Sequence, residues 1–395
     1  MNPSANDWIA KFLAVYEKST IIKQFDNSYL FYNALLNTGF IYGVSMSAVL
    51  DENLSSLQLT KEEYTKINLF HALLFSYFQK NKHSSYEEAI LSMNTYYKQL
   101  EKGKSGFLKK LSLYTSPSLQ LENIISVRLQ ETNNALKKSS TSVFTYALLY
   151  MDVLGYIDWL SRHKFAKQYS EKFEDVVMTC CFHALKAKKK KAKYDILLIE
   201  LFESSLDNKS LTIEDVHMLK RYGELEKNYI LDICTIAVWD DYEMDPSELN
   251  FLQDLTENLE FSPEKLQNSL NTLWAFSNQH STVIKLFEYI NPVKLFYKQS
   301  ASSVKLLILR NKNRLIKELT ESGELLVLLS QSTLRDLNTE EKNKVKEQLL
   351  DICKTIPSLT IFLLPGGTIL LPLLVKFIPK LLPSAFNENR INKKK

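Results

Sequence analysis

The chain has 395 residues, with 49 basic and 45 acidic side chains, a net charge of +4 and 45% hydrophobic residues. This composition is typical of a globular protein, and it excludes a disordered chain and a nucleic-acid binder that depends on bulk positive charge. Glycine (9 residues) and proline (10 residues) are scarce, so the sequence predicts a mostly helical chain.

The residues that usually carry chemistry do not cluster in this sequence. The four cysteines have no CxxC spacing and indicate a reducing compartment, and the six histidines are scattered. No phosphate loop, dinucleotide motif or nucleophile elbow is present. The first residues, MNPSANDWIAKF, lack the regions of a signal peptide. We therefore predict a protein that is not an enzyme and has no cofactor and no metal centre.

The N-terminal helical region is predicted to span 1–105. Thr60 precedes the apolar pattern KEEYTKINLFHALLFSYFQK, and Glu63 follows three residues later, which is the spacing of a capping box. A second helix pattern, SSYEEAILSMNTYYKQLE, has Ser84 or Ser85 as its cap. Both patterns predict well-defined helix starts in this region.

The second helical region is predicted to span 106–193, after the linker KGKSG. It contains two helix patterns within 118–165 and a third over about 167–187, which continues into AKKKKAK. This basic run is interpreted either as a contact with an anionic surface or as a solvated helix end in which lysines complement the helix dipole. We favour the second interpretation.

The third helical region, 194–332, contains the acidic turn AVWDDYEMDPSELN. This turn resembles that of the TerB-like helical module, which reads A-D-G-x-[IL]-x-x-x-E, at Asp241, Met244 and Glu248. Tyr242 stands where that module has its turn glycine. The resemblance covers about 40 residues.

A second acidic turn precedes the first by 33 residues, so that Asp207 corresponds to Asp240. Clustered carboxylates are ligands for hard cations, and Asp207, Asp240, Asp241 and Glu248 are the candidates for such a site. Acidic residues also cap the starts of helices and complement the helix dipole there. We favour the capping interpretation.

The C-terminal region, 333–395, contains 20 residues without a charge from Ile356 to Val375. A helix of this length spans about 30 Å, the thickness of a bilayer core. Prolines spaced by seven residues fall within about 40° on one helix face, and Lys376 lies in that stripe. The predicted membrane-segment residues are Pro357, Pro365, Gly366, Gly367, Pro372, Lys376, Pro379, Lys380 and Pro383.

Three arrangements of this segment remain open. It is a kinked spanning helix, or Gly366 and Gly367 break it into a re-entrant or surface-lying hairpin, or it is a buried helix pair in a soluble bundle. In a membrane, Lys376 and Lys380 reach the headgroups, and the basic tail NENRINKKK favours the cytoplasmic side. Membrane contact is the prediction that we favour.

The segment LNTEEKNKVKEQLLDICKTIPSLTIFLLPGGTILLPLLVKFIPKLLPSAF resembles the membrane segment of the LETM1 family. The matching positions are Leu337, Thr339, Glu341, Cys353, Pro357, Pro365, Leu371, Pro372, Lys376, Pro379, Leu382, Pro383, Ser384 and Phe386. In that family a soluble domain with a ribosome-binding-like fold follows the span. Only nine residues follow Phe386 here, so we expect that domain to be missing and the ribosome not to be a partner.

The resemblance implies a bacterial LETM1-related, biofilm-associated protein of the inner membrane, with the bulk of the chain cytoplasmic and a role in ion homeostasis or cation/proton exchange. The alternative is a non-enzymatic helical scaffold with a TerB-like module, anchored at the membrane and binding partner proteins. The predicted fold is all-α, a multi-helix soluble region followed by a proline-kinked, membrane-associated helical segment. The expected partners are membrane lipid, protein partners and further copies of the chain, with no nucleic acid.

Overall fold

A computed structural model describes residues 1–23, 25–50, 58–102, 116–135, 144–191, 193–205, 219–239, 244–280, 304–333, 335–356, 359 and 371–382. Within these ranges the regular elements are helices, and no strand occurs. The predicted all-helical fold is confirmed for the described part of the chain.

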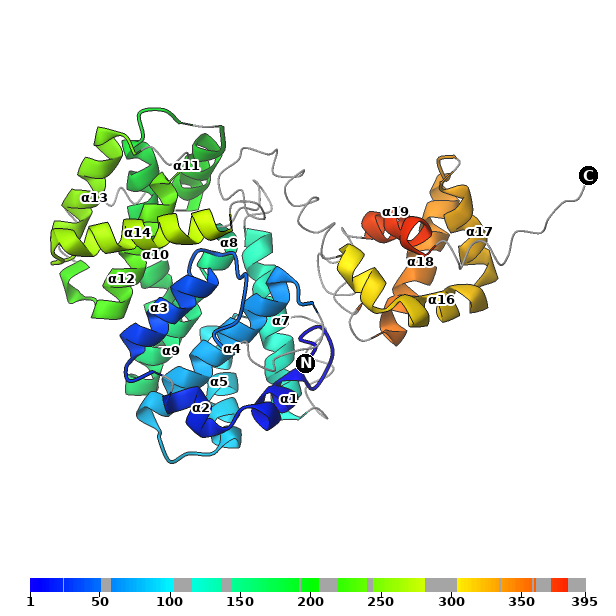
Figure 1. Cartoon of the computed structure of the whole chain (residues 1–395), viewed down its shortest axis with the longest axis horizontal. Helices are drawn as coiled ribbons and strands as arrows, with labels where there is room; N and C mark the ends of the chain where they lie inside the picture. The colour runs from blue at the N-terminus through cyan, green and yellow to red at the C-terminus, as the bar shows by residue number, and fades with distance from the viewer. Residues whose placement is uncertain are drawn as a thin grey trace, which may run out of the picture.

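The helices form two bodies, each with its own buried core (Figure 1). The larger body contains α1 (Trp8–Val15), α2 (Lys18–Lys23), α3 (Ser28–Thr38), α4 (Lys61–Lys80), α5 (Tyr86–Leu100), α7 (Pro117–Ala135), α8 (Phe144–Ala147), α9 (Tyr150–Arg162), α10 (Ala166–Ala187), α11 (Lys193–Ser205), α12 (Glu224–Val238), α13 (Pro246–Asn258) and α14 (Pro263–Gln279). The smaller body contains a helix over 304–310, α16 (Lys312–Glu321), α17 (Gly323–Gln331), α18 (Thr339–Thr355) and α19 (Leu371–Leu381).

Helix α4 lies at the centre of the larger body. Every residue from Thr65 to Phe78 is buried, because α4 contacts α7 and α9 as well as shorter helices on its other sides. Its first turn has the predicted capping box, in which the Thr60 hydroxyl accepts the N–H of Glu63 and the Glu63 carboxylate accepts the N–H of Thr60. Ser85 caps α5 in the same way, so both predicted helix starts are confirmed.

A buried ion pair fastens α7 to α9. The Arg128 guanidinium donates through Nε and Nη2 to the two carboxylate oxygens of Asp152, each at 2.8 Å. The Tyr97 hydroxyl on α5 donates to the same carboxylate at 3.2 Å. The two charged side chains are only 6% and 2% exposed, so three helices meet at one enclosed charge pair.

A buried carboxyl joins α7 to the start of α1. Glu122 accepts the backbone N–H groups of Asp7 and Ile9 at 2.9 and 2.8 Å, and it is 4% exposed. Burial raises the pKa of Glu122 from 4.5 to about 7, although the two hydrogen bonds favour its charged form.

This raised pKa predicts a pH-dependent stability. Between pH 4.5 and 7 the folded chain holds a proton on Glu122 that the unfolded chain releases, so its stability falls as the pH rises through this window and then levels off. At about 1.4 kcal/mol per pH unit, the effect over this window is at most about 3.5 kcal/mol. Urea unfolding from pH 4.5 to 8 should show this fall in the parent and not in Glu122→Gln. Parallel curves for the two proteins would contradict the assignment.

The four cysteines are buried and free. The basic run that follows α10 begins with Lys188, whose side chain is 1% exposed and pairs with Asp195 at 3.0 Å. The backbone N–H of Lys189 donates to the Asp245 carboxylate. Two of the residues in this run therefore make contacts within the larger body.

The smaller body contacts the larger one through Arg310. Its guanidinium donates to both carboxylate oxygens of Glu63, at 2.7 and 3.1 Å, and further bonds reach the carbonyl of Gln58 and the Asn2 side chain. The charged side chains are 7% and 1% exposed. The Ser4 hydroxyl also donates to Glu63, so the chain start, the cap of α4 and the smaller body meet at one carboxylate.

Candidate functional site

Helix α18 forms the base on which the terminal helix packs. Asn338 caps it in a capping box with Glu341, and Arg335 donates to both oxygens of the Glu341 carboxylate at 2.6 and 2.8 Å. The arginine hydrogen bonds lower the pKa of Glu341 to about 2. Burial raises the pKa of the Cys353 thiol to about 12, so this thiol stays protonated and takes part in core packing.

Helix α19 packs its apolar side chains into the core of the smaller body. It contacts α17 and α18, and the buried residues at this contact are Leu371, Leu373, Leu374, Phe377 and Ile378. Residues on α17 and α18, among them Leu325, Leu329, Val345 and Leu349, complete the same core. The apolar face of α19 is therefore covered by protein.

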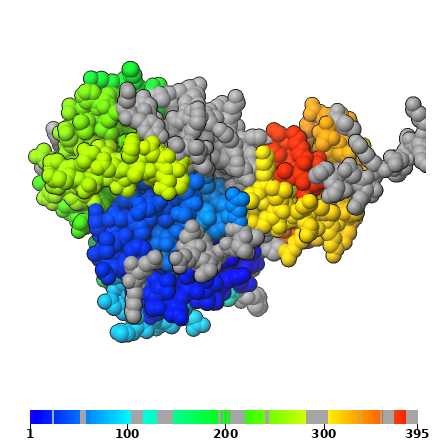
Figure 2. Space-filling view, viewed as in Figure 1, coloured from blue at the N-terminus to red at the C-terminus, as the bar shows by residue number. Residues whose placement is uncertain are grey.

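The opposite face of α19 holds the predicted prolines and lysines. Pro372, Lys376 and Lys380 are exposed and Pro379 is half-buried. In the space-filling view, α19 reaches the surface beside residues of the first helix of the smaller body (Figure 2). Four of the nine predicted membrane-segment residues are thus described, and they share the outer side of one helix.

Pro379 lies inside α19 and has no N–H to donate to the carbonyl of Val375. The other predicted membrane-segment residues, Pro357, Pro365, Gly366, Gly367 and Pro383, lie outside the described residues. Among the helices that the structure describes, none is both long and apolar enough to cross a bilayer.

Two lysines lie against one aromatic ring at this face. The Lys305 ammonium, from the helix over 304–310, is 4.7 Å from the centroid of the Phe377 ring. The Lys376 ammonium is 5.9 Å from the same centroid. Such cation–π contacts tether the lysines while leaving their charge at the surface. Lys305 is exposed and was not among the predicted residues.

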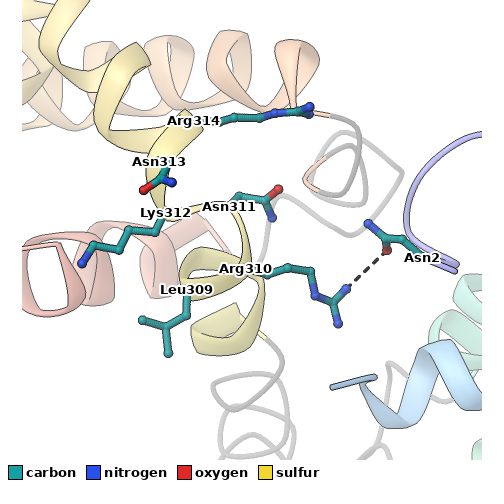
Figure 3. A pocket seen from close by; sticks show the side chains of 7 residues that line it. All are labelled: Asn2, Leu309, Arg310, Asn311, Lys312, Asn313 and Arg314. Carbon is teal, nitrogen blue, oxygen red and sulfur yellow. Dashed lines mark hydrogen bonds between the residues drawn. The ribbon is translucent and has the colours of Figure 1, made fainter. Parts of the chain in front are cut away.

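An open pocket of about 560 Å³ lies where Arg310 meets the chain start (Figure 3). Arg310 points toward Asn2 across it, whereas Lys312 and Arg314 extend from the start of α16 in different directions. The pocket therefore brings together three asparagine side chains and an arginine that is already hydrogen-bonded, and its cationic side chains do not converge on one point.

The predicted acidic residues form no metal centre in the described part of the chain. Glu248 is 5% exposed and accepts the N–H of Asp245 at 2.9 Å, while Asp245 accepts the N–H groups of Ser247 and Glu248, forming the capping box of α13. Asp207, Asp240 and Asp241 lie outside the described residues, and no group of three potential ligands occurs in the ranges described. Glu248 thus has the capping role that we favoured.

The fold and this face define an all-helical protein whose last described helix is basic and contains proline. Residues 337–395 match the family model described as "LETM1-like, RBD". The match begins at Leu337, the first residue on which the resemblance rested, and covers α18 and α19. It supports a LETM1-like assignment for this segment. The same residues were assigned above to the membrane span of that family, and because the matching model carries the description RBD, the match does not support the expectation that the ribosome-binding-like domain is missing.

Neither the comparison with curated proteins nor the comparison with solved structures gave a match. The residues that sequence reasoning missed are Lys305, Phe377 and the pair of Glu63 and Arg310. Lys305 begins the basic amphipathic pattern KLLILRNKNRLIKEL, residues 305–319, which is a sequence signal for an exposed basic helix face, but nothing local to the sequence indicates which helix it packs against.

Proposed function

We propose that this chain is a LETM1-related protein that acts at the bacterial inner membrane in ion homeostasis, with its larger body in the cytoplasm and a role in cell-envelope or biofilm physiology. The observation that carries the proposal is the outer face of α19, where Pro372, Lys376 and Lys380 are exposed. The apolar face of the same helix is covered by α17 and α18. The cytoplasmic leaflet is negatively charged and attracts such lysines. The family match over 337–395 supports the same reading.

Cation/proton exchange is the activity that we assign to this segment. A proline inside a helix frees a backbone carbonyl, and free carbonyls at broken helices coordinate cations in transporters. Pro379 frees the carbonyl of Val375 in this way. A pathway built from one short segment per chain needs several copies, so the proposal includes a homo-oligomer.

Cell fractionation tests membrane association directly. The full-length chain should sediment with the membranes and be released by detergent, because α19 and its flanking segment hold it there. Deletion of residues 356–395 should shift the protein toward the supernatant. If the full-length chain is wholly soluble without detergent, the membrane part of the proposal is wrong, whatever the deletion does to folding.

Reconstitution into liposomes tests the exchange activity. The full-length chain should move K⁺, Ca²⁺ or H⁺ above the rate in empty liposomes, and Pro372→Ala or Lys376→Ala should change that flux. Lys354→Ala is the matched control, because Lys354 lies on α18 and pairs with Asp351 at 2.6 Å on the exposed surface. Absence of flux from membrane-bound protein would contradict the exchange activity alone.

A second function, a scaffold that binds partner proteins through its larger body, is favoured by one observation. Large apolar side chains stand exposed on this body, including Phe165 at 59% and Trp274 at 52%. Scattered apolar residues are normal, but aromatic residues are enriched at protein interfaces. The scaffold function would be favoured by two results together. The protein would bind membranes without producing flux, and it would bind a partner protein that Trp274→Ser no longer binds.

A further inference from the structure

The positive charge of the smaller body is concentrated on two elements that meet at Phe377. The helix over 304–310, VKLLILR, and α19, LPLLVKFIPKL, contain no acidic residue. Arg310 is paired with Glu63, and the basic residues exposed on the two helices are Lys305, Lys376 and Lys380. By contrast, α18 contains four lysines and four acidic residues, and two of these acids are in ion pairs, Glu341 with Arg335 and Asp351 with Lys354. The Phe377 side of the body therefore carries a net positive charge, and the α18 side is balanced.

The ammonium groups of Lys305 and Lys376 approach the same ring, so each lies in the repulsive field of the other. A negatively charged group bound near both ammonium groups lowers that repulsion. Lys380 follows Lys376 by one helical turn on the same exposed side. These three lysines define what we call the Phe377 basic face.

The Phe377 basic face is compatible with a folded smaller body. The apolar side chains of α19 stay against α17 and α18, and only the outer side of the helix is needed for contact. All three lysines lie on exposed helix surfaces, where they can meet an extended layer of phosphate groups. Electrostatic attraction to such a layer contributes about 1 kcal/mol for each lysine near the surface.

We propose that the Phe377 basic face binds the phosphate groups of anionic lipid headgroups while α19 remains packed on α17 and α18. This inference rests on the membrane association in the proposed function and not on the exchange activity, and it specifies both the lipid and the manner of contact. It adds Lys305, which lies outside the matched residues 337–395, to the contact. It also predicts that the contact is peripheral and sensitive to salt, because exposed charges are screened.

The experiment uses the full-length chain and sedimentation with vesicles, either of phosphatidylcholine alone or of phosphatidylcholine mixed with phosphatidylglycerol. The parent should bind the mixed vesicles at low ionic strength and be released at high ionic strength. Each of Lys305→Gln, Lys376→Gln and Lys380→Gln should weaken partitioning about fivefold, and the triple variant about 100-fold. The matched control is the triple variant Lys342→Gln, Lys346→Gln and Lys354→Gln on α18, which removes the same charge and should bind almost like the parent.

A second measurement reports whether α19 leaves the body. Cys353 is 1% exposed and belongs to the core that α19 completes. Its labelling by maleimide, located by mass spectrometry, should stay as slow with anionic vesicles as without them. Rapid labelling of Cys353 on vesicles would overturn the packed arrangement.

Four other outcomes are decisive. Equal loss of binding in the α18 control would show that only total charge matters and would overturn the assignment to this face. Displacement from vesicles by inorganic phosphate, compared with chloride at equal ionic strength, would assign the face to free phosphate. Membrane binding that survives high salt and the triple variant would overturn this inference while the proposed function stands. Absence of the parent from all membranes would overturn both.

Discussion

Replacement of Asp152 by alanine is expected to lower the free energy of unfolding of the larger body by about 3–5 kcal/mol, because it leaves the Arg128 charge buried without its partner. The guanidinium is 6% exposed and is held by two hydrogen bonds of 2.8 Å between α7 and α9. The Tyr97 hydroxyl would lose its acceptor as well. Urea unfolding followed by circular dichroism measures the change.

The control for this prediction is Glu203→Ala. Glu203 pairs with Lys186 at 3.1 Å, but both side chains are about half exposed, so the loss should be about 1 kcal/mol or less. The double variant Arg128→Met and Asp152→Leu should recover much of the stability, since it removes both charges together. A loss in Asp152→Ala as small as that in Glu203→Ala would show that the pair is not enclosed in solution.

Glu63→Ala is expected to separate the two bodies and to cost about 3–5 kcal/mol, because it leaves Arg310 without the carboxylate that holds it. Arg310 and Glu63 are separated by 247 positions in the chain and are 7% and 1% exposed. Small-angle X-ray scattering should show a larger maximum dimension for the variant. Urea unfolding should show the loss of stability.

Glu88→Ala is the matched control for this second prediction. Glu88 completes the capping box of α5 as Glu63 completes that of α4, but it is exposed and caps α5 within the larger body. Its loss should cost about 1 kcal/mol or less and leave the scattering unchanged. Equal scattering from the parent and from Glu63→Ala would show that other contacts hold the bodies together.

The pKa of Glu63 adds a pH dependence to the same contact. Burial acts to raise this pKa, but hydrogen bonds and charge from Arg310 outweigh it, and the net result is a lowered pKa. A lowered carboxyl pKa means that the stabilisation is present above pH 4.5 and is lost as the pH falls through the folded value. Acid below pH 4.5 should therefore separate the two bodies, which stay in contact at neutral pH.

Local signals in the sequence predicted the helix starts well. A capping box needs only a side chain that accepts a hydrogen bond and a glutamate three positions later, and the pairs beginning at Thr60 and Ser85 both formed. The stripe of Pro372, Lys376 and Lys380 on one face also follows from helical spacing alone. These features depend on neighbours within one helical turn, which the sequence specifies directly.

Two other features depend on the tertiary fold. The contact of Glu63 with Arg310 joins two segments that are far apart in sequence, and no spacing rule identifies such partners. The apolar character of α19 predicts burial, but lipid and protein interiors are both apolar. In the structure, Leu373 and Leu374 pack in the core shared with α17 and α18, and periodicity cannot distinguish this surrounding from a bilayer.

Glu63 completes the first turn of α4 and also receives the arginine of the smaller body. The central helix of one body is therefore linked thermodynamically to the position of the other. A surface that captures the smaller body in its docked position raises the stability of α4, and one that pulls it away lowers it. The rate of amide hydrogen exchange at the start of α4 would then report whether the helices of the smaller body are bound to such a surface.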